Sequence, residues 1–147
     1  MYVPLSIILQ HSFTVFTYPS DVFLDLCDEY ANMLLCAGMD TVRRCAKDQM
    51  ISFVKEHFGY GCAPANIIRF MSHYECIRRE EQESGCSGII DEHQEGEAKC
   101  ASMSAYRECL ALSLGRRCGA ASIRELNASV AAFCSDLSLS YHGEDLS

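Results

Sequence analysis

The sequence predicts an all-α protein in which disulfides staple a bundle of about five helices. Three observations predict this fold class. Apolar residues recur every three or four positions, alternating strand patterns are scarce, and ten cysteines are spread along the chain. Because 49% of the 147 residues are hydrophobic and only 22% are charged, we expect one domain with a packed core.

Apolar stripes and local end signals place the expected helices. Ser20 is a candidate N-cap for the first helix, and the glycines at 59 and 61 end the second. Pro64 suits the first turn of the third helix, and Ser122 with Glu125 fits a capping box near the start of the fifth. The five helices are therefore expected at about 20–34, 40–58, 64–77, 97–115 and 122–137.

The cysteines indicate structural disulfides rather than a metal site or a redox motif. Zinc ligands come in pairs two to four residues apart, whereas the closest cysteines here are nine apart. Nine residues of helix span about 13.5 Å, but a disulfide needs Cα atoms within about 7 Å. Bridges must therefore join different helices, or a helix to a loop, and the pairing itself stays open. The predicted disulfide residues are Cys27, Cys36, Cys45, Cys62, Cys76, Cys86, Cys100, Cys109, Cys118 and Cys134.

The position of Cys76 on its helix indicates which kind of segment it bonds to. It falls opposite the apolar stripe of the third helix, so we expect it to bond to a loop outside the main core.

The cysteine spacing repeats along the chain. The first four cysteines are separated by 9, 9 and 17 positions and the last four by 9, 9 and 16, and the third of each set follows two arginines. This pattern predicts two related helical units, at about 21–62 and 97–134. They lie in one domain, 21–140, with a tail at 141–147, and the segment between them carries Cys76 and Cys86.

The cysteine content also predicts the compartment. Disulfides persist in oxidising surroundings, so a secreted, extracellular protein is expected. Residues 1–20 resemble a weak signal peptide: they contain short apolar runs but lack leading positive charge. Either this segment is a weak signal or the true start is elsewhere. Because no apolar run approaches the 18 to 20 residues of a membrane span, none is expected.

The charge of −8 disfavours nucleic acid and anionic lipid as partners. Most of the excess lies between Glu75 and Glu97, where Arg78 and Arg79 are the opposing charges. We interpret this stretch as a solvated loop, with an acidic docking strip for a basic partner as the alternative.

Catalytic and cofactor motifs are missing from the sequence. It contains no nucleophile elbow, phosphate-binding glycine loop or His-Glu-x-x-His pair, and its five histidines are scattered singly. The adjacent cysteines and His-Asp pair expected of a secreted phospholipase are also missing. We therefore expect a non-enzymatic protein with no catalytic residue, cofactor or metal; a hydrolase with a site assembled only in three dimensions is the less favoured alternative.

Two kinds of glycosylation signal are present. Asn127 begins an Asn-Ala-Ser acceptor triplet, at the margin of the apolar stripe of the fifth helix. Ser84 and Ser87 each precede a glycine near acidic residues, which is a context typical of glycosaminoglycan attachment. An ordinary flexible loop is the alternative interpretation of these Ser-Gly pairs.

Three stretches of the sequence carry a resemblance to known proteins. They are the Leu26-Cys27 to Cys45 spacing, the 66–70 helix leading to Glu75-Cys76-Ile77, and the stretch from Lys99-Cys100 through 106–109 to Cys118-Gly119. They resemble motifs of small secreted cysteine-rich helical proteins of nematodes and arthropods, in the hemolymph glycoprotein family and the chondroitin proteoglycan 4 type of domain. The resemblance runs from about Leu26 to Leu137.

The resemblance implies a secreted, non-enzymatic protein. With the predicted disulfides and acidic surface, it favours an extracellular binding or carrier module for a small apolar ligand or another protein. A structural matrix protein or proteoglycan core is the alternative.

Overall fold

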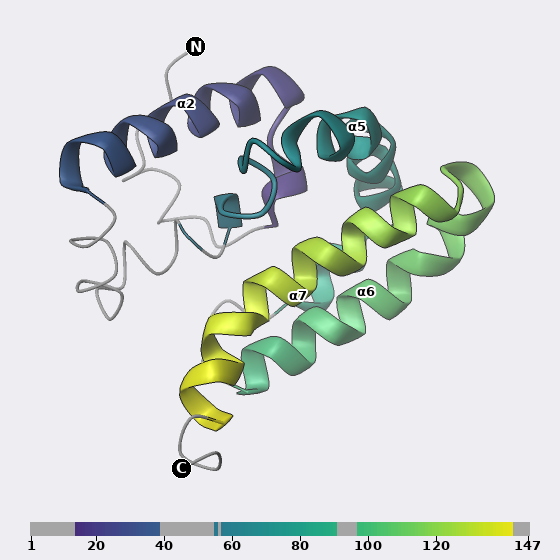
Figure 1. Ribbon diagram of the computed structural model, residues 1–147. Coiled ribbons are helices and arrows are strands. Elements are labelled where there is room, and N and C mark those ends of the chain that lie inside the picture. The colour runs from purple at the N-terminus through teal and green to yellow at the C-terminus, as the bar shows by residue number, and fades with distance from the viewer. Residues whose placement is uncertain (1–13, 39–54, 56, 91–96, 143–147) are drawn as a thin grey trace.

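The computed structural model describes residues 14–38, 55, 57–90 and 97–142, which form helices joined by turns and contain no strand. The predicted all-α fold class is therefore confirmed for this part of the chain. Four α-helices and two short 3-10 helices make up the described elements (Figure 1): η1 (Val15–Thr17), α2 (Ser20–Ala37), α5 (Ile67–Ser84), η2 (Cys86–Ile89), α6 (Glu97–Arg117) and α7 (Ala120–His142).

The expected helix at 40–58 lies largely outside the described residues. Of its positions, Lys55, His57 and Phe58 are described, and they are helical. The number of α-helices in the described residues, four, is close to the predicted five.

Helices α6 and α7 form a hairpin and lie side by side over most of their length (Figure 1). Cys118 and Gly119 make the turn between them, and the backbone N–H groups of both donate to the carbonyl of Leu114, at 2.8 and 2.9 Å. Gly119 has φ of 87°, a left-handed conformation that glycine adopts without steric cost. The sequence therefore ends α6 and starts α7 within two residues.

An aromatic cluster forms the core around α2 and α5. Phe23, Phe70 and Tyr74 are at most 1% exposed, and the ring centroids of Phe23 and Tyr74 are 5.0 Å apart. Gly61 packs against this cluster: a Cβ there would lie 2.7 Å from a ring carbon of Phe70 and 2.9 Å from one of Phe23. Glycine is thus required at 61 because the rings approach the backbone closely.

The core continues into the α6–α7 hairpin. Tyr106, Leu110 and Leu114 of α6 and Leu126 of α7 are all at most 1% exposed and belong to the same buried cluster as the aromatic rings. These residues recur every three or four positions, so the predicted apolar stripes are the buried faces of the helices.

Two predicted caps are wrong, because each helix begins earlier in the sequence than its expected cap allows. The N-cap of α2 is Pro19, and the N–H of Ser20 donates to a carboxylate oxygen of Glu75 at 3.1 Å. Helix α7 begins at Ala120, before the expected capping box, and Ser122 donates its hydroxyl proton to the carbonyl of Gly119 at 2.6 Å. The carboxylate that should complete the box bonds to other elements, as described below.

Four disulfides join elements within the described residues. Each links a helix to another helix or to a non-helical or 3-10 segment, as the helix geometry predicts. Cys76 bonds to the α6–α7 turn, which confirms its expected loop partner. The pairs are Cys27–Cys62, Cys76–Cys118, Cys86–Cys109 and Cys100–Cys134.

The pairing parallels the cysteine spacing. In each predicted unit the first cysteine bonds to the fourth, with sequence separations of 35 and 34. The Cys36 side chain and all of Cys45 lie outside the described residues.

Candidate functional site

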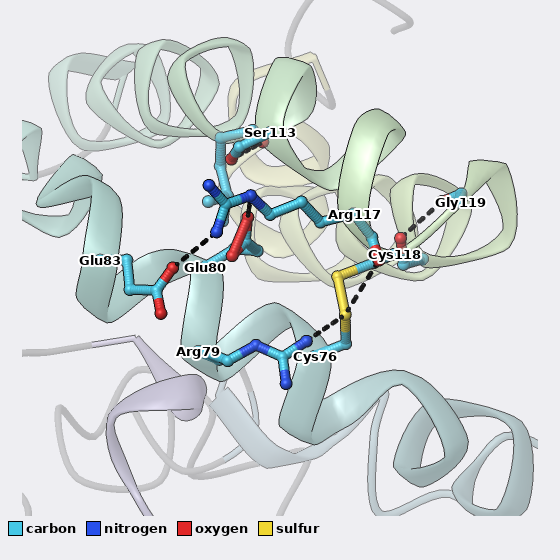
Figure 2. The surroundings of a disulfide bond; sticks show 10 residues. Cys76, Arg79, Glu80, Glu83, Ser113, Arg117, Cys118 and Gly119 are labelled. Carbon is cyan, nitrogen blue, oxygen red and sulfur yellow. Dashed lines mark hydrogen bonds and ion pairs between the residues drawn. A yellow bond between two sulfur atoms is a disulfide. The ribbon is translucent and has the colours of Figure 1, made fainter.

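The candidate site surrounds the disulfide between Cys76 of α5 and Cys118 of the α6–α7 turn (Figure 2). The two Cα atoms are 5.9 Å apart, and both cysteines are half-buried. Because Phe70, Tyr74 and Ile77 use the inner face of α5, Cys76 lies on its flank and ties the hairpin turn to the outside of the core. We call Cys76, Arg79, Arg117 and Cys118, with the carboxylates that bind Arg117, the Cys76 site.

A guanidinium contacts one sulfur of this disulfide. Arg79, one helical turn after Cys76, places Nη2 3.3 Å from Cys76 Sγ and donates to it. Within the described part of the chain, Arg79 makes no ion pair with a carboxylate. The backbone carbonyl of Arg117 lies 3.8 Å from the same sulfur, and this is a contact rather than a hydrogen bond, because a disulfide sulfur carries no proton.

A second guanidinium, that of Arg117, joins the end of α6 to α5 through two ion pairs. Arg117 Nε lies 3.3 Å from Glu80 Oε1, and Nη1 lies 3.0 Å from Glu83 Oε2 (Figure 2). Glu80 is 2% exposed, and its Oε2 atom makes no hydrogen bond to a described group. A buried carboxylate is costly without a counter-charge, so Arg117 is the group that makes this burial tolerable.

Glu81, the neighbour of Glu80, sits in a separate buried cluster. It is 3% exposed, and its Oε2 atom accepts hydrogen bonds from Thr14 Oγ1, at 2.5 Å, and from the Tyr106 hydroxyl. Burial raises the pKa of Glu81 despite these two hydrogen bonds and the nearby charge of Arg78. The cluster links the segment before η1 to α5 and α6, so its role is structural.

Tyr74 strengthens the same link. Its buried hydroxyl lies 2.5 Å from the carbonyl of Val15 and 2.7 Å from that of Tyr18, and both carbonyls are within reach of its single proton. Burial raises the pKa of Tyr74, so the hydroxyl keeps its proton and remains a donor.

Glu125 of α7 is the third buried carboxylate, at 4% exposure. Arg69 Nε lies 3.1 Å from its Oε1 atom, and the Tyr60 hydroxyl donates to Oε2 at 3.1 Å. These contacts tie α7 to α5 and explain why Glu125 does not serve the predicted capping box.

The predicted solvated loop between Glu75 and Glu97 is wrong for its first part. Residues 75–84 continue α5, and Glu80 and Glu81 are buried with partners. Glu75 and Glu83 remain more than half exposed, so an acidic docking strip would have fewer charges here than the sequence suggested.

The predicted glycosylation residues lie on different elements. Asn127 is exposed on α7. Ser84 is exposed as the last residue of α5; its hydroxyl donates to the carbonyl of Glu81 at 3.3 Å and accepts the N–H of Cys86 at 3.2 Å. Ser87 is half-buried in η2, and Glu81, one of the acidic neighbours of the Ser-Gly pairs, is turned into the core.

No group of three or more His, Cys, Asp or Glu side chains in the described part of the chain could hold a metal ion. None of the described helices is long and apolar enough to cross a membrane. The sequence did not predict the roles of Arg79 and Arg117. Two signals were available: an arginine three residues after Cys76, and the arginine pair directly before Cys118.

Fold and site together define a small, cysteine-rich, all-α protein with a disulfide-stapled core. Comparison of the chain with known protein families, with curated proteins and with solved structures finds no match.

Proposed function

We propose that the protein is a secreted, non-enzymatic extracellular binding module, with a small apolar ligand or another protein as its partner. The observation that carries the proposal is the set of four disulfides, which join α2, α5, η2, α6 and α7 to each other or to their loops. Bonds of this kind persist in oxidising compartments and add about 2–4 kcal/mol each. The resemblance to secreted cysteine-rich helical proteins supports the same location.

The described surface supports an exposed binding role. Leu35 on α2, Ile68 on α5 and Leu112 on α6 are 82%, 84% and 74% exposed. Aromatic rings fill the space between α2 and α5, so a partner is better placed against the outside of the helices than in that part of the core.

Location is tested by measuring peptides of this protein in the cells and in the extracellular fluid of its source. We expect the protein outside the cells, with no cysteine reactive to maleimide before reduction. Protein confined to the cells with free thiols at the described disulfide positions would contradict the proposal.

Ligand binding is tested on protein purified from the extracellular fraction. Mass spectrometry of the organic extract, compared with that of the same protein after denaturation and refolding, should show a lipid released only by the native sample. If neither a lipid nor a stoichiometric protein partner co-purifies, the binding role is wrong.

A matrix protein or proteoglycan core is the second candidate. The exposure of Ser84, Gly85 and Gly88 at the junction of α5 and η2 favours it, because a transferase can reach this segment. Intact mass before and after chondroitinase treatment tests it, with Ser84→Ala and Ser87→Ala as matched variants. No change in mass in the native protein would exclude this candidate, and treatment with a glycosidase would test Asn127 in the same way.

A further inference from the structure

We propose that the Cys76–Cys118 disulfide is a thiol-exchange site, at which a small thiolate attacks Cys118 and Cys76 leaves as the thiolate. The proposal rests on the position of one cation. Among the described side chains, Arg79 is the charged group that contacts a disulfide sulfur, at 3.3 Å from Cys76 Sγ. Thiol exchange is faster when the departing thiolate is stabilised, and a neighbouring arginine supplies that stabilisation.

Attack at Cys118 is a balanced exchange. The thiolate R–S⁻ forms a new bond to Cys118 Sγ while the bond from Cys118 Sγ to Cys76 Sγ breaks, and the electron pair stays on Cys76 Sγ beside the guanidinium. A second thiolate can then attack R–S–Sγ of Cys118, which forms R–S–S–R and leaves a Cys118 thiolate that takes a proton from water. The protein gains two electrons and two small thiols become one disulfide.

The other three disulfides lack this combination of access and charge. Cys27 and Cys86 are 6% and 2% exposed, so a thiolate left on either sulfur would be buried. Cys100 and Cys134 are both half-buried, but no described cation contacts their sulfurs. The thiolate at Cys76, in contrast, would form at a half-buried position already bonded to Arg79.

The surrounding contacts allow the bond to open without releasing the helices. Arg117 holds the end of α6 beside α5 through Glu80 and Glu83 (Figure 2). The Cys86–Cys109 bond lies inside the loop that Cys76–Cys118 closes. Exchange therefore frees the α6–α7 turn locally and leaves the two sulfurs near each other, so that the Cys76 thiolate can displace R–S⁻ and close the bond again.

The test treats the oxidised full chain with reduced glutathione under native conditions, stops the reaction with acid, alkylates free thiols with N-ethylmaleimide and maps the peptides. We expect Cys76 to carry the maleimide and Cys118 the glutathionyl group before any other described disulfide opens. Glutathione mainly on Cys76, or earlier opening of Cys100–Cys134, would overturn the proposal.

Arginine variants isolate the role of the guanidinium. Arg79→Gln should slow exchange at Cys118 by up to about fivefold, which corresponds to the ~1 kcal/mol that two unit charges about 4 Å apart gain in water. Arg79→Lys should keep most of the rate, and added salt should reduce the difference between Arg79→Gln and the unchanged protein.

The matched control is Arg124→Gln, which removes the same charge from an exposed position on α7 that contacts neither sulfur. It should exchange at the rate of the unchanged protein. If Arg79→Gln also exchanges at that rate while its urea midpoint is unaltered, the guanidinium has no role and the proposal is wrong.

Discussion

Removing the Cys76–Cys118 disulfide should cost about 3 kcal/mol of unfolding free energy, less than its loop length alone implies. This bond spans 42 residues and encloses Cys86–Cys109, which spans 23. In the unfolded chain the Cys86–Cys109 bond shortens the covalent path between Cys76 and Cys118. Subtracting the inner span from the outer one leaves about 19 residues, and the chain-entropy relation then gives about 3.2 kcal/mol.

Removing the Cys76–Cys118 disulfide should cost more unfolding free energy when the Cys86–Cys109 bond is absent. In a chain that already carries Cys86→Ser and Cys109→Ser, a path of up to 42 residues is closed by the outer bond, and its removal should cost close to about 3.9 kcal/mol. The Cys100–Cys134 bond offers a second path of about 40 residues, which lowers this figure by less than about 0.1 kcal/mol. The expected difference between the two backgrounds is therefore about 0.7 kcal/mol.

Urea unfolding under non-reducing conditions measures both costs. The assay compares Cys76→Ser/Cys118→Ser with its parent in each background, and the m value should rise as cross-links are lost, because the unfolded chain expands. Equal costs in the two backgrounds, or a larger cost when Cys86–Cys109 is intact, would refute the nested-loop reasoning. A cost below about 1 kcal/mol would show that native-state strain offsets the entropic gain.

Three further predictions concern the core and its polar links. Tyr74→Phe should lower the unfolding free energy by about 1–3 kcal/mol, because the carbonyls of Val15 and Tyr18 lose the hydroxyl of Tyr74 and the Val15 carbonyl keeps a longer bond from the Tyr18 N–H, at 3.5 Å; an unchanged urea midpoint would contradict this. Gly61→Ala should cost about 1–3 kcal/mol, because the new methyl group would overlap two buried rings, whereas Gly88→Ala, with open space around it, is the control. The raised pKa of Glu81 should make stability fall as pH rises from its ordinary value of 4.5, because the folded state holds the proton more tightly than the unfolded state. Glu81→Gln should flatten this dependence in urea titrations across that range, and an identical pH profile in both proteins would show that another group controls it.

The helices were predictable because their signals are local. The apolar stripes predicted helices at about 20–34, 97–115 and 122–137, and the structure has Ser20–Ala37, Glu97–Arg117 and Ala120–His142. Helix α5 was predicted to end seven residues early. Its last turns carry Glu80 and Glu81, and in the sequence these charged residues favoured a loop. In the folded protein they are buried, with Arg117 as the partner of Glu80 and with Thr14 and Tyr106 as the partners of Glu81.

The candidate site was predictable only in part. Helix geometry excluded bonds between cysteines nine apart in one helix and gave Cys76 a loop partner, but it could not select Cys118 among the loop cysteines. The contact of Arg79 with Cys76 is within one helical turn and follows from the sequence once α5 is known to continue past Ile77.

By itself, the sequence determined the all-α class, the buried faces of the helices and the use of cysteine for cross-links, because periodicity and residue spacing act over a few turns of chain. Only the tertiary structure decided which cysteines meet and which carboxylates are buried. Those choices depend on residues that are 23 to 67 positions apart, such as Cys86 with Cys109 and Thr14 with Glu81, and packing alone brings them together.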